Sequence, residues 1–292
     1  MNVLPGLLLG VLLTAVGCSE TQTAGGRIDA VLASLVPADT IVLSGVEMET
    51  LRTTPTYQKI LAQKGLREID EFAARTKFDP RKDVREILAV SDGTSTVILA
   101  RGNFRPGPIK GVQQTKYKGW TLYGKGEGAF ALLDATTAAA GPEAAVKKLI
   151  DHKSTAPAAL FDRVKALPAG GQIWAVSAGW GNLVDRFGPK EGNGANLGRV
   201  FRSLENTTVV ADLRNGLEAQ IDGLAKTDQD AKTLGDAVRG MVGLGRLSVP
   251  ENRPEMLRIF DGIKVEQQQK SIRIRMKIGQ GLVDQLIALG GR

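Results

Sequence analysis

The 292-residue sequence contains one cysteine and one histidine. A disulfide needs two cysteines, and a structural zinc site needs several Cys or His ligands, so one chain alone supports neither. Hydrolases commonly use histidine as their acid or base, but His152 stands alone, beside Lys153, at the end of a predicted helix. A cation there favours the helix C-terminus, which is a structural role. We therefore expect no catalytic residues, no bound metal and no cofactor.

Long hydrophobic runs are also scarce. The longest is LPGLLLGVLLTAVGC, residues 4–18, which is shorter than the ~20 residues that a membrane-spanning helix needs. Its length and its small residues at the end are typical of an export signal. Its last residues, AVGC, resemble the lipobox of bacterial lipoproteins, whose cysteine is acylated after cleavage. We expect a signal peptide over residues 1–17 and lipidation of Cys18; an ordinary secretory signal cut nearby is the alternative.

No block of charge of one sign is present, although the formal net charge is +7. Lys and Arg alternate with Asp and Glu along the chain, whereas nucleic-acid-binding proteins usually gather their cations in a stripe or cluster. Export of the chain also separates it from DNA. We therefore expect no nucleic-acid partner.

Turn and cap signals divide the mature chain into short strands and helices. Asp92-Gly93 and Asn215-Gly216 lie between apolar runs and predict two hairpins. Thr227 followed by Asp230 has the spacing of a capping box, and an apolar stripe follows it. The order of elements in one half matches that in the other. We predict an α+β protein made of two similar repeats, with mainly antiparallel sheets covered by helices: residues 18–37 form a lipidated tether and short helix, 38–169 the first repeat and 170–292 the second.

Several finer expectations follow from local pattern. Apolar spacing predicts a helix over 195–204 and helix in two pieces over 48–76. Pro106 and Pro108 indicate a loop over 102–114. The residues Gly243 to Arg246 are typical of a helix end.

The sequence predicts how the two arms of the last hairpin, residues 263–278, pair with each other. Alternation points Ile263 and Val265 inward from one arm, and pairing Glu266 with Arg273 places opposite charges across the ladder. Basic side chains of the second arm then share the outer face. A tryptophan that lies between two glycines after a predicted strand joins these cations as a candidate. The candidate ligand-binding residues are Trp180, Arg273, Arg275 and Lys277.

Several strings are similar to those of a group of uncharacterised bacterial secreted proteins and lipoproteins. They include FDPRKD at 78–83, YKGWTLYG at 117–124 and TDQDAKTLGDAVRGMVGLGRLS at 227–248. The resemblance covers most of the mature chain and implies an exported protein with a duplicated α+β domain. The group has no known activity, so it implies no site residue.

We therefore expect a non-catalytic, lipid-anchored cell-envelope protein with a binding or structural role. Its partners would be the membrane, through the anchor, and an envelope protein or a glycan. If the cell has two membranes, Ser19 resembles the sorting residue of lipoproteins on the periplasmic face of the outer membrane. Two alternatives remain open: a hydrolase of envelope polymers that uses carboxylates or a Ser–Lys pair built on Ser91 or Ser177, and a binder of anionic lipid headgroups or glycans.

Overall fold

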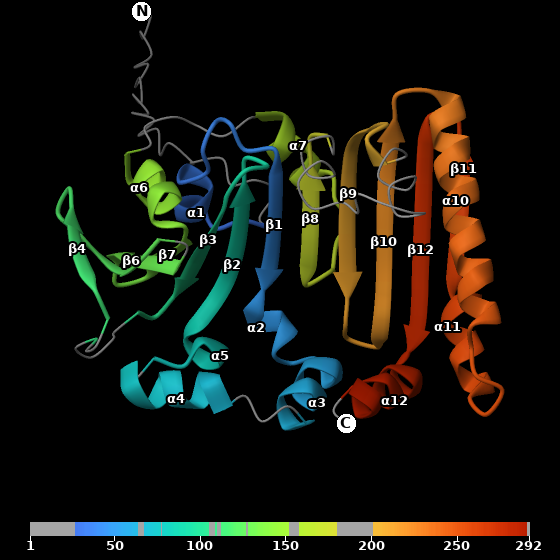
Figure 1. Cartoon of the computed structure of the whole chain (residues 1–292), viewed down its shortest axis with the longest axis horizontal. Helices are drawn as coiled ribbons and strands as arrows, with labels where there is room; N and C mark the ends of the chain where they lie inside the picture. The colour runs from blue at the N-terminus through green and yellow to red at the C-terminus, as the bar shows by residue number, and fades with distance from the viewer. Residues whose placement is uncertain are drawn as a thin grey trace, which may run out of the picture.

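A computed structural model describes residues 27–63, 67–76, 78–104, 109, 112–126, 128–151, 158–179 and 201–290. These residues contain one sheet of twelve strands in the order β11-β12-β10-β9-β8-β1-β2-β3-β7-β6-β5-β4. Every pair of neighbouring strands is antiparallel. The protein therefore belongs to the α+β class, as predicted (Figure 1).

The N-terminal half supplies seven strands: β1 (Val42–Glu47), β2 (Val84–Ser91), β3 (Thr96–Gly102), β4 (Gln114–Tyr117), β5 (Trp120–Lys125), β6 (Gly128–Asp134) and β7 (Thr137–Gly141). The C-terminal half supplies the other five: β8 (Ile173–Ser177), β9 (Leu204–Asp212), β10 (Gly216–Ala225), β11 (Ile263–Gln268) and β12 (Ser271–Gly279). Strands β1 and β8 pair at the centre and join the halves into one sheet. In each half the third strand pairs with the last one, β3 with β7 and β10 with β12.

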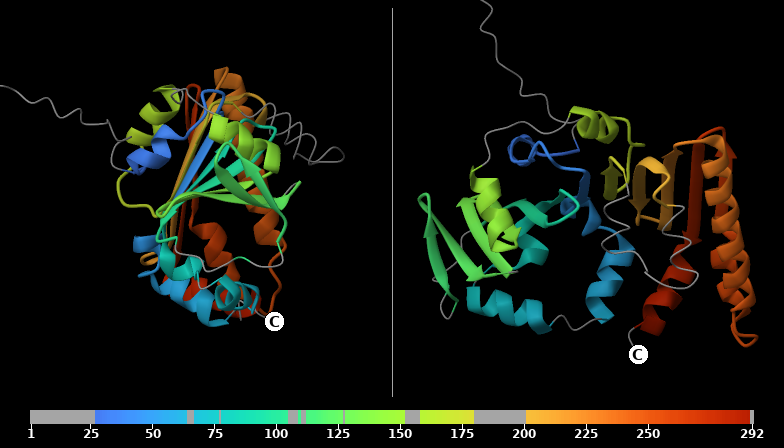
Figure 2. Two further views of the ribbon diagram at one scale, coloured as in Figure 1. Left: turned by 90° about the vertical axis from the view of Figure 1, so that its left-hand side faces the viewer. Right: turned by 45° about the horizontal axis from the view of Figure 1, so that its top comes forward.

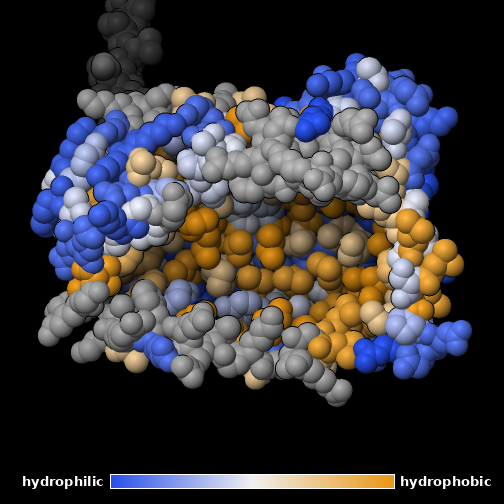
Figure 3. Space-filling model, in the orientation of Figure 1, coloured by the Kyte–Doolittle hydropathy of each residue, from blue (hydrophilic) through white to orange (hydrophobic). Residues whose placement is uncertain are grey.

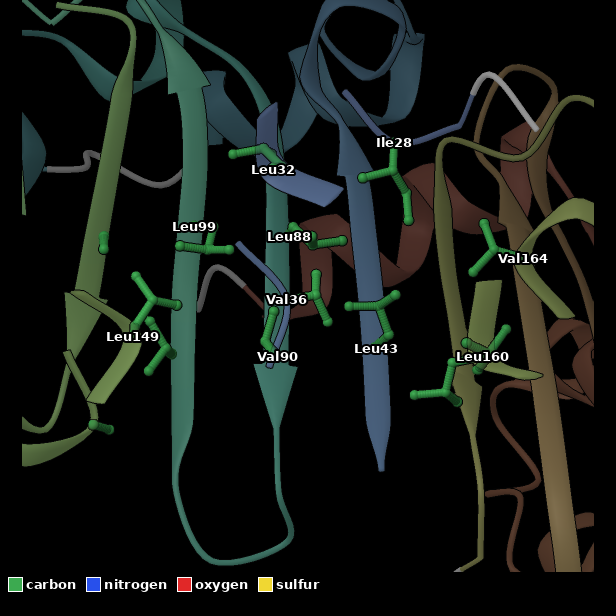
Figure 4. Packing of buried hydrophobic residues seen from close by; sticks show 14 of the residues in the cluster. Ile28, Leu32, Val36, Leu43, Leu88, Val90, Leu99, Leu149, Leu160 and Val164 are labelled. Atoms are coloured by element: carbon green, nitrogen blue, oxygen red, sulfur yellow. The ribbon is translucent and has the colours of Figure 1, made fainter. Parts of the chain in front are cut away.

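Three short helices cover one face of the sheet: α1 (Ala30–Ser34), α6 (Glu143–Asp151) and α7 (Ala158–Lys165). Leu32, Val146 and Val164 from these helices are fully buried against strand residues such as Leu43 and Leu88 (Figure 4). Burial of a leucine or valine side chain contributes roughly 1.5–3 kcal/mol to the stability of the fold. This cluster contains the most buried residues, and we call it the main core.

The other helices lie at one end of the strands and beside the last of them (Figures 1 and 2). At the lower end in Figure 1 are α2 (Met48–Leu51), α3 (Pro55–Gln63), α4 (Arg67–Thr76), α5 (Pro80–Asp83) and α12 (Gln280–Gly290). Helix α10 (Asp228–Leu247) packs on Ile272, Val265 and Ile274 through Leu234 and Val238. It is followed by a 3-10 turn, Pro254–Met256, and α11 (Leu257–Asp261).

The predicted local signals are confirmed where the structure describes them. Both hairpins form, and Glu266 lies opposite Arg273. The Thr227 hydroxyl accepts the backbone N–H of Asp230 at 3.0 Å, so the N-cap of α10 is as expected.

The described residues between Gly102 and Gln114 belong to no helix or strand, as predicted. Three expectations about element boundaries are wrong. Residues 48–76 contain three helices, α2 to α4, where helix in two pieces was expected. Leu204 begins β9 and not the end of a helix; residues 195–200 of that prediction lie outside the described residues. Helix α10 continues through Gly243 to Leu247. Gly245 does not end the helix; it lets the ring of Phe260 pack where a side chain would stand.

Candidate functional site

The face of the sheet opposite the main core carries apolar side chains across almost its whole width. Residues paired directly across antiparallel strands point to the same side, so the register traces them as rows. One row runs through eleven strands and contains a single polar residue, Ser44: Val265, Ile274, Ile221, Val209, Ala175, Ser44, Ala89, Ile98, Ala140, Phe130 and Tyr123.

A second row lies beside the first and has no polar residue. It consists of Ile263, Met276, Ala219, Ala211, Ile173, Val46, Ile87, Ala100, Ala138 and Leu132. The side chains of both rows are half-buried or exposed, and Ile98 is 38% exposed, whereas Leu43, Leu88 and Leu99 on the other face are fully buried. Figure 3 shows this face as a hollowed hydrophobic surface framed by the helices at its lower end and by α10 at its side. We call it the apolar hollow.

The apolar hollow contains a cavity of about 340 Å³ over β2, β3, β6 and β7. Ile87, Ile98, Phe130 and Leu132 line it from the sheet. Small side chains on β7, such as Ala138, leave the space free because they reach only a short way above the sheet. Such a cavity favours hydrocarbon and offers few hydrogen bonds to a polar ligand.

Aromatic side chains stand at the borders of this cavity. The rings of Phe78 and Phe104 lie 5.1 Å apart at a tilt of 36°, and both line it. Tyr57 from α3 packs in the same cluster as these two rings. On the other side, Tyr123 stacks on Phe130 with ring centroids 5.0 Å apart. Aromatic side chains offer large contact areas at little cost in conformational entropy, so they suit the rim of a binding site.

Helix α10 adds an exposed apolar stripe at the side of the apolar hollow. Met241, Leu244 and Leu247 are 40%, 66% and 84% exposed. They follow each other at three-residue spacing, on a flank of the helix next to the side that packs on the sheet.

The predicted cationic site has a different character from the apolar hollow. Arg275 pairs with Glu266 at 2.7 Å and Lys277 with Glu218 at 2.6 Å, while Arg273 pairs with Asp222. The three cations lie on one exposed sheet face, and acids of the neighbouring strands balance each of them. Trp180 and Cys18 lie outside the described residues.

A smaller polar cavity of about 310 Å³ lies on the helix-covered face, where Glu47 and Glu86 face each other across β1 and β2. Burial raises the pKa of Glu86 to about 7. Both carboxylate oxygens of Glu86 accept the backbone N–H of Asp29, at 3.1 and 3.2 Å. Arg101 Nε lies 3.1 Å from Asp29 Oδ2 as an ion pair, without the geometry of a hydrogen bond. Glu86 therefore holds the segment that leads into α1.

The two serines considered for a catalytic Ser–Lys pair lie in different surroundings. The Ser91 hydroxyl donates to the Ser95 carbonyl at 2.8 Å within the β2–β3 turn. The Ser177 hydroxyl is buried, without a hydrogen-bond partner among the described residues. In the described part of the chain, no three His, Cys, Asp or Glu side chains converge as metal ligands. None of the described helices combines the length and the apolarity needed to cross a membrane.

The apolar hollow was not predicted, although the sequence carries a signal for it. The runs ILAV at 87–90, VILA at 97–100 and AAA at 138–140 are apolar at consecutive positions. Strands that meet water on one face alternate polar and apolar residues, whereas consecutive apolar residues indicate apolar contacts on both faces. The first half of the sheet shows this second pattern.

Comparison with known proteins gives a likeness of fold. No family model matches the chain, and no curated protein matches it. Solved structures of the Treponema protein TP0453 are similar to it. Crystal form III has a TM-score of 0.51 at 10% identity, over 89% of this chain and 97% of TP0453. Crystal form I has a TM-score of 0.47 at 10% identity, over 89% of this chain and 96% of TP0453. At this identity, the match to crystal form III shows that TP0453 shares the fold of this chain.

Proposed function

We propose that this protein is a non-catalytic, lipid-anchored cell-envelope protein that binds the hydrocarbon part of an amphiphile in the apolar hollow. The observation that carries the proposal is the pair of apolar rows on a sheet face that stays half-exposed. Soluble proteins rarely leave apolar patches of more than a few hundred Å² open to water, and such patches usually mark binding sites.

The energy of binding would come from apolar surface removed from water. Each Å² of apolar surface covered by a ligand is worth roughly 25 cal/mol. Ligand cavities commonly measure ~300–1,000 Å³. The cavity over β2, β3, β6 and β7, at about 340 Å³, is of this size and continues into the open part of the apolar hollow.

Binding can be tested with a neutral fluorescent hydrocarbon probe, N-phenyl-1-naphthylamine, and the soluble chain without its first 18 residues. We expect the probe to bind wild-type protein and to brighten. Ala138→Trp would fill the cavity, because Ala138 lines it, and should weaken probe binding roughly tenfold, the equivalent of about 1.4 kcal/mol.

The matched control is Ala135→Trp. Ala135 lies in the exposed turn between β6 and β7, so the same large side chain should leave probe binding unchanged. Equal binding by wild type and Ala138→Trp, or no binding by wild type, would contradict the proposal.

The anchor is tested separately, by growing cells with a labelled fatty acid. We expect label in the wild-type protein and none in Cys18→Ala, because the thiol is the acceptor in the lipoproteins whose lipobox this segment resembles. An unlabelled wild-type protein would contradict the lipid anchor.

A further inference from the structure

The polar cavity beside β1 and β2 brings two carboxyl groups together. Glu47 and Glu86 lie directly opposite each other, and both line the cavity of about 310 Å³. The backbone N–H of Glu47 points the other way, toward β8, where it donates to the Gln172 carbonyl at 2.8 Å. Glu47 and Glu86 are therefore a pair without hydrogen bonds between their backbones, the arrangement in which side chains come closest. Like charges directly opposite each other destabilise a sheet, and a cation between them would remove that cost.

The cations around this pair are held by other groups. Arg101 pairs with Asp29 at 3.1 Å. Arg27 also lines the cavity, but its guanidinium donates to two backbone carbonyls. Neither Glu47 nor Glu86 has an ion pair among the described residues, whereas the acids opposite the cations of β12 each have one. The two carboxyl groups thus face the cavity without a counter-ion.

A tryptophan forms another wall of the same cavity. Trp174 on β8 is only 3% exposed, and it lines the cavity. Its indole N–H has no acceptor among the described residues, whereas that of Trp120 donates to the Leu133 carbonyl at 3.2 Å. The indole nitrogen is not fully buried, so an oxygen atom in the cavity can approach it. A donor that has lost most of its water and has no acceptor is costly, and tryptophan is also the ring that cations favour most.

We propose that this cavity binds a small molecule that carries a primary ammonium group and, beside it, an oxygen acceptor. The ammonium group would lie between the carboxylates of Glu47 and Glu86, and the oxygen would accept the N–H of Trp174. Glu47 is exposed, so the ligand can enter beside it. The cavity lies on the face of the sheet opposite the apolar hollow, so this binding is independent of the proposed binding of hydrocarbon.

The test compares three molecules of nearly equal size. Ethanolamine carries both groups, n-propylamine has a methyl group in place of the hydroxyl, and ethylene glycol has a second hydroxyl in place of the ammonium group. Each is titrated into isotope-labelled protein, and the indole N–H signal of Trp174, assigned with Trp174→Phe, reports binding by NMR. Both analogues should bind roughly tenfold more weakly than ethanolamine, the equivalent of about 1.4 kcal/mol, because each loses one set of hydrogen bonds.

Variants of the two carboxyl groups locate the effect. Glu47→Gln and Glu86→Gln keep the shape of the side chain and remove its charge, so each should weaken ethanolamine binding roughly tenfold. Glu49→Gln is the matched control, because it removes an exposed carboxylate of α2 that does not line the cavity. This control should bind ethanolamine as the wild type does.

The pH dependence of binding gives a second readout. Burial, together with the facing charges of Asp29, Glu47 and Arg101, sets the pKa of Glu86 at about 7, and Arg27 lines the same cavity. An aliphatic amine stays protonated well above this pH. Ethanolamine should therefore bind the wild type more tightly as the pH rises through about 7, because Glu86 becomes charged, and this gain should be absent from Glu86→Gln.

The inference is overturned if ethanolamine leaves the Trp174 signal unmoved, or if either analogue binds as tightly as ethanolamine. Binding of ethanolamine by Glu47→Gln at the wild-type level would also overturn it. Because Glu47 is exposed, this variant keeps the test decisive even where a change at Glu86 lowers the melting temperature, which is measured alongside.

Discussion

Glu86 is a largely buried carboxyl group whose protonation near neutral pH affects the stability of the fold. Its pKa is raised by burial from an ordinary value of 4.5 to about 7, and the charges of Asp29 and Glu47 act in the same direction. The charge of Arg101 and the N–H of Asp29 oppose the shift. Arg27 lines the same cavity and is electrostatically coupled to Glu47.

A raised pKa means that the folded protein keeps this proton to a higher pH than the unfolded chain does. The contribution of Glu86 is therefore fully present below about pH 4.5 and is lost as the pH rises through about 7. We expect Glu86→Gln to flatten the decline in melting temperature over this range. Melting curves from pH 5 to 8 measure it, and a wild-type slope that persists in the variant would contradict the assignment.

Gly45 has no side chain, and this lets a tryptophan of the neighbouring strand pack closely on β1. It lies opposite Trp174 across β1 and β8, and a Cβ atom at this position would overlap the indole ring. We expect Gly45→Ala to destabilise the protein by roughly 1–3 kcal/mol, the usual cost of overpacking. Urea unfolding measures the change. Gly128→Ala is the control, since a Cβ there meets no atom within 4 Å.

At the scale of the element, α10 depends on its first turn. The Thr227 hydroxyl accepts the Asp230 N–H, and its loss leaves a backbone donor without a partner. Thr227→Ala should lower the free energy of unfolding by about 1 kcal/mol. Thr233→Ala, an exposed change inside the same helix, should have less effect; equal losses from both variants would show that the cap is unimportant.

Elements whose signals are local could be predicted from the sequence. The Asp92-Gly93 and Asn215-Gly216 turns, the Thr227 cap and the Glu266–Arg273 register all depend on residues close in the chain, and all are present. The continuation of α10 past Gly243 could not be predicted, because glycines are typical of a helix end, whereas Gly245 allows close packing of Phe260 from a later segment.

The candidate site also depends on contacts between segments that are distant in the sequence. The cations of β12 were correctly placed on one face, but the acids that balance two of them come from β10, across a pairing that no local pattern indicates. The apolar hollow is likewise formed by strands distant in sequence, since β1 pairs with β8 and β3 with β7. Consecutive apolar residues indicate that these strands are apolar on both faces. Only the order in which the strands pair shows that their second apolar faces lie side by side as one surface.

In the whole molecule, the proposed function depends on the apolar hollow, which we propose binds hydrocarbon chains. The most direct test is photo-crosslinking with a diazirine-bearing fatty acid, followed by mass spectrometry of the labelled peptides. We expect label on β2, β3, β6 and β7, near Ile87, Ile98 and Phe130, and a loss of that label in Ala138→Trp. Label confined to the exposed stripe of α10, or spread evenly over the surface, would contradict it.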